Sequence, residues 1–353
     1  MKLSKKQKQI VETREKKVHV VACAAAGKTT LIVERIRYLL NIGVAPSKIV
    51  AITFTNNAAL EMYERLGRPV GLFIGTVHSY CNFLLKSNGV DTSKYIEKEN
   101  FDELFQLIKE NPNYIQSIEH LIIDEFQDSS PAQIEFFQLL NPTNYMYCYD
   151  HRQSIYSFGD ADVDSIISLQ NEPDVVVYKI NENYRNGYNI LNFAKNLLYN
   201  LGADYQDNST AQRIEDGYVW HTKWSYNNIA DWFLEVESPL KDWFVLARSN
   251  AEIHILADLF DKKRIPYTTF KQGNLTLEEI EKELNSDKIK LLTIHSAKGL
   301  ESPNVLVVNS KLYNDEERRV YYVAATRAKN FLIWNKIRVE KKKKRKVNMV
   351  SWE

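Results

Sequence analysis

The feature that most constrains this chain is a run of small residues, 22–30, that contains Gly-Lys-Thr at positions 27–29. An apolar run ends just before it, and a helix-like pattern of apolar residues follows over 31–40. A strand, a tight turn with Gly-Lys-Thr and a helix bind phosphates through backbone N–H groups, a lysine and a Mg²⁺-binding threonine. The pattern predicts a phosphate-binding loop, and a small-residue turn that packs a helix on a sheet is the alternative.

Two alanines depart from the usual form of this loop. Ala22 stands where the first glycine is expected, and Ala25 stands where glycine is usual in the family that the motifs described below resemble. A left-handed backbone at an L-residue costs on the order of 1 kcal/mol. The two alanines therefore weaken the case for nucleotide affinity more than the case for the fold.

A second pattern begins where the apolar run 121–123 leads into Asp124 and Glu125. In a Walker B site the first carboxylate holds hydrated Mg²⁺, and the second orients and deprotonates the attacking water. A solvated acidic turn is the alternative for an isolated pair, but the phosphate loop upstream favours the site. Phosphoryl transfer also needs cations at the γ-phosphate. Arg185 and Arg327 are candidates, although by spacing alone each could be a surface arginine.

The charge of the chain is unevenly distributed. Its 353 residues include 46 basic and 45 acidic side chains, for a net charge of +1. Residues 1–17 carry +5 and residues 336–353 carry +6, so the rest of the chain is at −10. This balance at first argues against a protein that holds nucleic acid by bulk charge. Only the ends of the chain are basic.

Cysteine content and hydropathy indicate the compartment. The three cysteines have no paired spacing, which gives neither a disulfide framework nor a zinc pattern. No apolar run approaches the ~20 residues of a membrane span, and the N-terminus lacks a signal-peptide core. We expect a soluble, cytoplasmic protein. The basic run 341–347 has the form of a nuclear import signal, but a disordered, phosphate-binding tail is the favoured interpretation.

Short apolar runs that alternate with longer amphipathic segments predict buried parallel strands in α/β units. These runs are 18–21, 49–54, 121–123, 145–149, 175–180, 243–247, 289–294, 305–308 and 331–334. We expect a first domain over 1–178 with a small helical insertion at about 82–118, a second domain over 179–338 and a basic tail over 339–353.

The motifs, in this order, resemble those of the UvrD/Rep/PcrA helicases of superfamily 1 from Leu3 to about Trp334. The matching segments are LSKKQ at 3–7, TFTNNAA at 53–59, GTVHS at 75–79, DEFQD at 124–128, QSIY at 153–156, NYR at 183–185, TIHSAKGLE at 293–301 and YVAATRA at 322–328. The resemblance implies two RecA-like P-loop NTPase domains with parallel sheets. ATP and single-stranded DNA would bind at the interdomain cleft, and the motor would move 3′ to 5′.

The resemblance also implies roles for individual residues. Those for ATP hydrolysis are Lys28, Asp124, Glu125, Gln153, Arg185 and Arg327 (the arginine finger), with Mg²⁺ at Thr29 and Asp124. Those that bind the nucleotide are Gln7 at the adenine, Ala25, Ala26, Gly27, Lys28, Thr29 and Thr30 in the loop, Tyr184 on the base, Arg185, Glu301 at the ribose, and Arg327. Those along the DNA are Phe54, Thr55, Asn56, Thr76, His78, Tyr156, Phe158, His295 and Lys298. Core or capping roles are the alternative for the two histidines.

The chain departs from the family mainly in size. Only 46 positions separate His78 from Asp124, and 110 separate Arg185 from His295, where full-length relatives carry large helical insertions. Thr30 also replaces an arginine common in relatives, and the segment after Tyr156 keeps an aromatic residue but lacks an arginine. What remains is close to a bare two-domain motor.

Two functions stay open for such a motor. One is an ATP-driven translocase that unwinds tailed duplex DNA. The other is a DNA-sensing ATPase subunit that signals to a protein partner such as a nuclease, since the helicase component of the Gabija antiviral system is similarly compact. A P-loop ATPase that does not act on nucleic acid is disfavoured by the segments around Thr76, His78 and Gln153.

Overall fold

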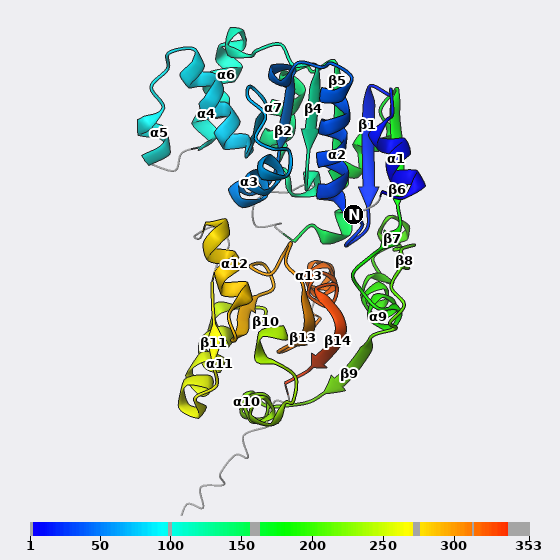
Figure 1. Cartoon of the computed structure of the whole chain (residues 1–353), viewed down its shortest axis with the longest axis vertical. Coiled ribbons are helices and arrows are strands. Elements are labelled where there is room, and N and C mark those ends of the chain that lie inside the picture. Colours follow the sequence, from blue (N-terminus) through cyan, green and yellow to red (C-terminus); the bar gives the residue numbers. More distant parts are fainter. Residues whose placement is uncertain (1–2, 98–100, 156–162, 271–275, 313, 338–353) are drawn as a thin grey trace, which may run out of the picture.

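Two six-stranded sheets, each built only from parallel strands, organise the chain (Figure 1). The computed structural model describes residues 3–97, 101–155, 163–270, 276–312 and 314–337. The strand order is β3-β2-β4-β5-β1-β6 in the first sheet and β11-β12-β10-β13-β14-β9 in the second. The α/β class with parallel sheets is therefore confirmed.

The first half alternates strands and helices. Its strands are β1 (Lys17–Ala22), β2 (Ile49–Ile52), β3 (Phe73–Gly75), β4 (His120–Ile123), β5 (Asn144–Tyr149) and β6 (Val175–Ile180). Its helices are α1 (Lys5–Val11), α2 (Lys28–Asn41), α3 (Asn56–Arg65), α4 (Val77–Ser87), α5 (Ser93–Glu97), α6 (Phe101–Glu110), α7 (Pro131–Leu139) and α8 (Val163–Ser168). Helix α6 packs against α4, α5 and α7, beside the sheet.

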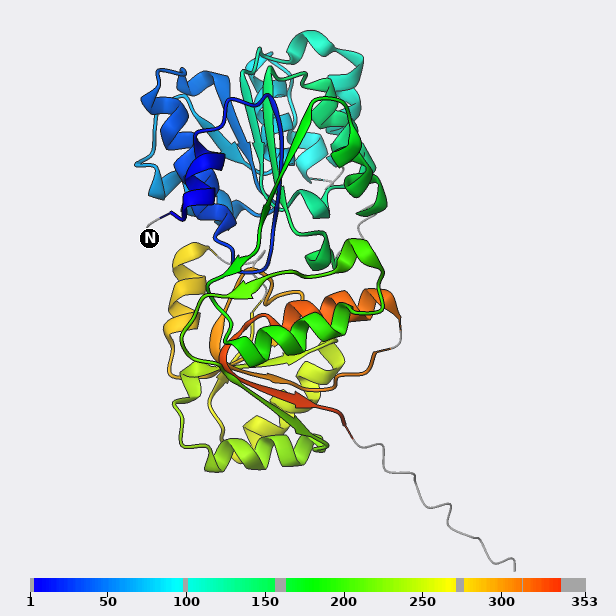
Figure 2. The same ribbon diagram turned by 90° about the vertical axis from the view of Figure 1, so that its right-hand side faces the viewer.

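The second half begins with a small two-stranded parallel sheet, β7 (Glu182–Asn183) and β8 (Thr210–Ala211). The strands of its large sheet are β9 (Tyr218–Thr222), β10 (Trp243–Ala247), β11 (Tyr267–Thr268), β12 (Ile289–Thr293), β13 (Ser302–Val307) and β14 (Ala328–Asn335). Its helices are α9 (Tyr188–Leu198), α10 (Tyr226–Glu235), α11 (Asn250–Lys263), α12 (Leu277–Asn285) and α13 (Asp315–Ala325). Helices α9 and α13 lie side by side, facing the first half (Figure 2).

Side-chain alternation along β1 explains why its apolar run does not alternate in polarity. Val18 and Val20 join one buried cluster, whereas Val21 joins another on the opposite face of the sheet. A strand buried on both faces needs apolar side chains at every position. The second sheet is likewise flanked by two buried clusters.

Each apolar run predicted as a strand overlaps a strand in the structure. The additional strands of the two large sheets, β3, β9 and β11, are short or half-exposed, and β9 lies at a sheet edge with Tyr218 60% exposed. The expected domain boundary after residue 178 falls inside β6, because this strand stays paired with β1 as far as Ile180. The first sheet therefore extends two residues beyond that boundary.

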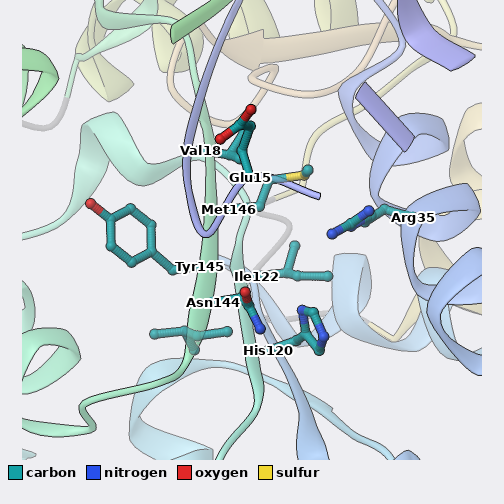
Figure 3. A pocket seen from close by; sticks show the side chains of 9 residues that line it. Glu15, Val18, Arg35, His120, Ile122, Asn144, Tyr145 and Met146 are labelled. Atoms are coloured by element: carbon teal, nitrogen blue, oxygen red, sulfur yellow. The ribbon is translucent and has the colours of Figure 1, made fainter. Parts of the chain in front are cut away.

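A small cavity lies at the amino ends of β1, β4 and β5, where Arg35 of α2 and His120 line it (Figure 3). The Arg35 guanidinium donates to the carbonyl oxygens of Val11 (2.7 Å) and Thr13 (2.8 Å). The cavity of about 10 Å³ is no larger than a single water site. The phosphate loop lies at the opposite ends of these strands, so the cavity is separate from it.

Candidate nucleotide site between two parallel sheets

The phosphate loop connects β1, which pairs with β5 and β6, to the N-terminus of α2. Gly27 caps α2 with a φ of 77°, a conformation that glycine adopts without strain. Ala25 is also left-handed, with a φ of 58°. The strain foreseen for this alanine is therefore present. Ala22 ends β1 and does not have a positive φ, so its missing glycine carries no such cost.

The loop is bonded to the segment where the chain crosses from one sheet to the other. The Cys23 N–H donates to the carbonyl oxygen of Ile180 (2.9 Å), and the Asn183 amide donates to that of Ala24 (3.0 Å). The Tyr184 N–H donates to the Ala25 carbonyl (3.2 Å). The backbone of Tyr184, predicted to stack on the base, is thus fixed beside the phosphate loop.

Two side chains reach the loop from other helices. The Gln7 amide of α1 donates to the Ala26 carbonyl (3.0 Å), while its oxygen accepts from the Ser4 N–H (2.8 Å). From α3, the Arg65 guanidinium donates to the Thr30 hydroxyl (2.9 Å). Arg65 was not among the predicted residues. It places a guanidinium beside the position where relatives often carry an arginine and this chain has Thr30.

The acidic pair at the end of β4 lies against the loop lysine. Lys28 Nζ is 3.6 Å from a Glu125 carboxylate oxygen, and Asp124 accepts a hydrogen bond from the Glu125 N–H (2.9 Å). Burial and the neighbouring Glu125 raise the pKa of Asp124 to about 7. Burial also opposes ionisation of Glu125, but the charges of Lys28 and Lys298 lower its pKa overall. Asp124 is therefore the weaker acid of the pair, while Glu125 is ionised at neutral pH.

The donors present fit a magnesium ion that is shared with a nucleotide. Asp124 is a buried carboxylate whose charge has no full compensation, as its raised pKa indicates. Within the described ranges, no three His, Cys, Asp or Glu residues gather to form a protein-only metal site. Mg²⁺ is commonly held by one or two carboxylates together with substrate phosphates. Thr29 and Asp124 would supply the protein oxygens.

A glutamine from the first half and an arginine from the second meet directly. The Arg327 guanidinium donates to the Gln153 side-chain oxygen at 3.1 Å and to the carbonyl oxygens of Val323 and Leu300 at 3.0 and 3.2 Å. Arg327 is only 2% exposed. Burial and the nearby Arg185 lower its pKa to about 9. An anion at this point would restore the balance of charge.

Arg185 and Glu301, both predicted to bind nucleotide, pair with each other at 2.6 Å. Lys329 lies 2.6 Å from the second Glu301 oxygen and was missed by the sequence reasoning, although it follows the Thr326-Arg327-Ala328 motif directly. Burial acts to raise the pKa of Glu301, but Arg185 and Lys329 lower it to about 2. The carboxylate is therefore ionised at neutral pH.

The first group of predicted DNA contacts gathers at the carboxyl ends of β2 and β3. These neighbouring strands are parallel, and the Thr53 N–H donates to the Gly75 carbonyl (3.0 Å). Phe54 is 44% exposed, and the exposed Asn56 begins α3. Thr55 and Thr76 are the N-caps of α3 and α4. His78 packs its ring 5.5 Å from that of Phe105.

The second group lies against the first half. His295 Nε2 is 3.1 Å from the Ile155 carbonyl, and Lys298 bonds to the Asp128 carboxylate and the Gln153 carbonyl. Tyr156 and Phe158 lie outside the described residues. The structure thus brings the nucleotide residues together across the two sheets, while contact of these side chains with DNA stays a prediction.

A phosphate loop, an acidic strand end and an arginine from the second half, which has its own parallel sheet, together define a P-loop NTPase with two RecA-like domains. Residues 3–113 and 100–174 match the UvrD/REP helicase N-terminal domain, and residues 270–338 match the UvrD-like helicase C-terminal domain. The chain belongs to the UvrD-like helicases of superfamily 1.

Similar proteins carry the name ATP-dependent DNA helicase PcrA. The one from Staphylococcus epidermidis is 25% identical in an alignment 367 residues long, gaps included, that covers 75% of this chain and 50% of that protein. The one from Staphylococcus aureus is 24% identical over 371 residues, with the same coverage. The chain therefore spans about half the length of these relatives. Within the described part of the chain, no helix is long and apolar enough to span a bilayer.

Proposed function

We propose that this chain is a DNA helicase motor that hydrolyses ATP between its two halves and moves 3′ to 5′ along single-stranded DNA. The contact between Gln153 and Arg327 carries the proposal. One residue follows β5 of the first sheet and the other follows α13 of the second half. A γ-phosphate bound at this contact would join the halves, and hydrolysis would release them.

Each group has a definite task in this mechanism. Lys28 and the loop N–H groups bind the phosphates, and Arg185 and Arg327 stabilise the charge that develops on the γ-phosphate. Glu125 orients and deprotonates the attacking water, a role that suits a carboxylate kept ionised by Lys28. A magnesium ion at Thr29 and Asp124 would neutralise phosphate charge.

The polarity and the DNA track rest on family membership. The relatives are named DNA helicases, and Phe54 offers an exposed aromatic face at the end of β2. Stacking of bases on such a ring contributes ~1–3 kcal/mol per base without sequence preference. Alternate gripping by the two halves during the ATP cycle would then produce net movement along the strand.

A second function is favoured by the small size of the second half. Residues 188–293 are used to build α9 to α12 and β8 to β12, which leaves no separate helical insertion between the first and second motifs of this half within the described ranges. A motor with so little accessory structure is suited to sense DNA and to signal through its ATP cycle to a protein partner such as a nuclease. Weak unwinding without that partner would be its signature.

ATP turnover with and without single-stranded DNA tests the proposal, together with strand displacement on 3′-tailed and 5′-tailed duplexes. We expect DNA to stimulate hydrolysis, and only 3′-tailed duplexes to be unwound. A rate of ATP hydrolysis that is the same with and without DNA would reject the motor, and equal unwinding of 3′-tailed and 5′-tailed duplexes would reject the polarity. Stimulated hydrolysis without displacement would favour the signalling function.

The catalytic base has its own test. Glu125→Gln should leave ATP binding intact and abolish turnover, because the amide cannot accept the proton of the water. Glu119→Gln is a matched control, since Glu119 is exposed and precedes the same strand at its amino end. Turnover retained by Glu125→Gln would remove this residue from the assigned role.

A further inference from the structure

Arg152 is buried between carboxylates from both halves of the molecule. Its Nε lies 2.6 Å from Asp150, which follows β5, and its Nη1 lies 2.7 Å from Asp207, which precedes β8. The side chains are 5%, 0% and 0% exposed, respectively. Neither Arg152 nor Asp207 belongs to a motif recognised in the sequence, and the nucleotide mechanism does not use them.

This triad, Asp150–Arg152–Asp207, continues into the candidate nucleotide site at both ends. At one end, the second Asp150 oxygen accepts from the Gln153 amide (2.7 Å). At the other end, the second Asp207 oxygen accepts from the Tyr322 hydroxyl (2.8 Å). Tyr322 lies on α13, the helix that leads into Arg327.

The contacts therefore form a closed ring. From Gln153 the ring passes through the triad to Tyr322, along α13 to Arg327, and back to the Gln153 oxygen at 3.1 Å. Asp150, Gln153, Tyr322 and Arg327 are each at most 5% exposed. The side-chain amide of Gln153 is bonded at both ends by members of the ring, its nitrogen to Asp150 and its oxygen to Arg327.

The chemistry of the triad suits a geometric role more than a stabilising one. Taking three charges out of water costs free energy that their attraction only partly returns, so a buried ion cluster is weak evidence for stability. A guanidinium, however, holds its donors in a rigid planar fork. With one carboxylate from each half, that fork fixes the register between Gln153 and α13.

We propose that Arg152 and Asp207 are positioning residues for ATP hydrolysis, which hold Gln153 and Arg327 in register on the γ-phosphate. The inference rests on the proposed function and concerns the same site. Loss of either residue would leave the phosphate loop and its ATP contacts in place. It would loosen only the contact that acts in the transition state, so kcat should fall while the KM for ATP changes little.

DNA-stimulated ATP turnover by the full chain tests the positioning role with Asp207→Asn, which keeps the shape of the side chain and removes its charge. We expect a fall in kcat of about 10-fold or more, with the KM for ATP within about threefold. Asp204→Asn is the matched control, because Asp204 is exposed and lies three residues earlier in the same segment. It should behave as the wild type.

Two further variants keep the test independent of folding. Tyr322→Phe removes one hydroxyl and should lower kcat by a smaller factor, about threefold, with an unchanged melting temperature. Arg152→Gln combined with Asp207→Asn should be no slower than the more impaired single variant, since both changes break the same ring. Multiplicative losses in the double variant would overturn the ring as a unit.

The outcomes separate the two proposals. Wild-type kcat in Asp207→Asn, or a loss confined to the KM for ATP, would overturn the positioning role while the motor stands. A wild-type chain that hydrolyses no ATP would overturn the proposed function itself. A kcat loss in Asp207→Asn and Tyr322→Phe, with the KM held and Asp204→Asn unaffected, would support the role of the ring.

Discussion

Ala25→Gly should stabilise this protein, although alanine to glycine is ordinarily destabilising. Ala25 has a φ of 58° in the phosphate loop, which costs an L-residue about 1–2 kcal/mol. Glycine removes that cost but gains freedom in the unfolded chain, which opposes folding by about 0.5–1 kcal/mol. The expected net gain is about 0.5–1 kcal/mol, or about 1–3 °C in the Tm of the first half.

The sign of the effect is the critical measurement. Ala26→Gly, one residue later, serves as control because Ala26 is 1% exposed and does not have a positive φ. It should lose about 0.5–1 kcal/mol from the backbone and about 0.8 kcal/mol from the buried methyl group. Urea unfolding gives the free energy of unfolding of both variants, and their midpoints can be compared directly if the dependence of that free energy on urea concentration is the same. A midpoint lowered equally by both substitutions would refute the strain argument.

Three further predictions concern catalysis, pH and DNA affinity. Arg327→Lys should lower kcat by about 100-fold, because an ammonium cannot reproduce the forked contacts with Gln153 and the two carbonyl groups, whereas Arg318→Lys on the preceding helix α13 should not. His19, whose pKa burial lowers to about 4, stays neutral in the folded protein while the unfolded chain binds a proton below 6.5. Stability should therefore fall by up to about 3 kcal/mol as the pH drops from 6.5 to 4, and His19→Phe should flatten this slope in pH-dependent unfolding. Removal of residues 340–353 should weaken binding of single-stranded DNA mainly at low salt, as measured by titration at several salt concentrations.

Each of these has a contrary result. Arg327→Lys with wild-type turnover would show that the guanidinium fork is not needed. An unchanged pH slope in His19→Phe would place the titrating group elsewhere. An affinity loss that is independent of salt after removal of 340–353 would show that the tail makes specific contacts and does not act through charge alone.

The interior strands can be predicted from the sequence because their burial is reflected in a short local run of apolar residues. β2 and β4 are buried on both faces, so their apolar runs can be recognised as strands without knowing which strands they pair with. β9 escapes such reasoning because, at the edge of its sheet, three of its five residues are exposed. Its place is fixed by pairing with β14, which lies more than a hundred residues later.

The candidate site divides in the same way. Lys28, Asp124 and Glu125 could be predicted because loop and strand chemistry restricts their residue types at fixed spacings. The bond between Arg152 and Asp207 could not, since two residues 55 positions apart meet only through the packing of the two halves. The contacts of Lys298 with Asp128 and Gln153 likewise depend on how the second half packs against the first.

The hydrogen bonds between the phosphate loop and the segment that crosses between the halves couple the position of the loop to any movement of the second half. Residues 23, 24 and 25 of the loop are tied in turn to residues 180, 183 and 184, where the chain passes into the second half. A rotation between the halves that preserved these bonds would turn about the nucleotide loop. Groups farther from the loop, such as those at the ends of β2 and β3, would then be displaced more than the loop itself.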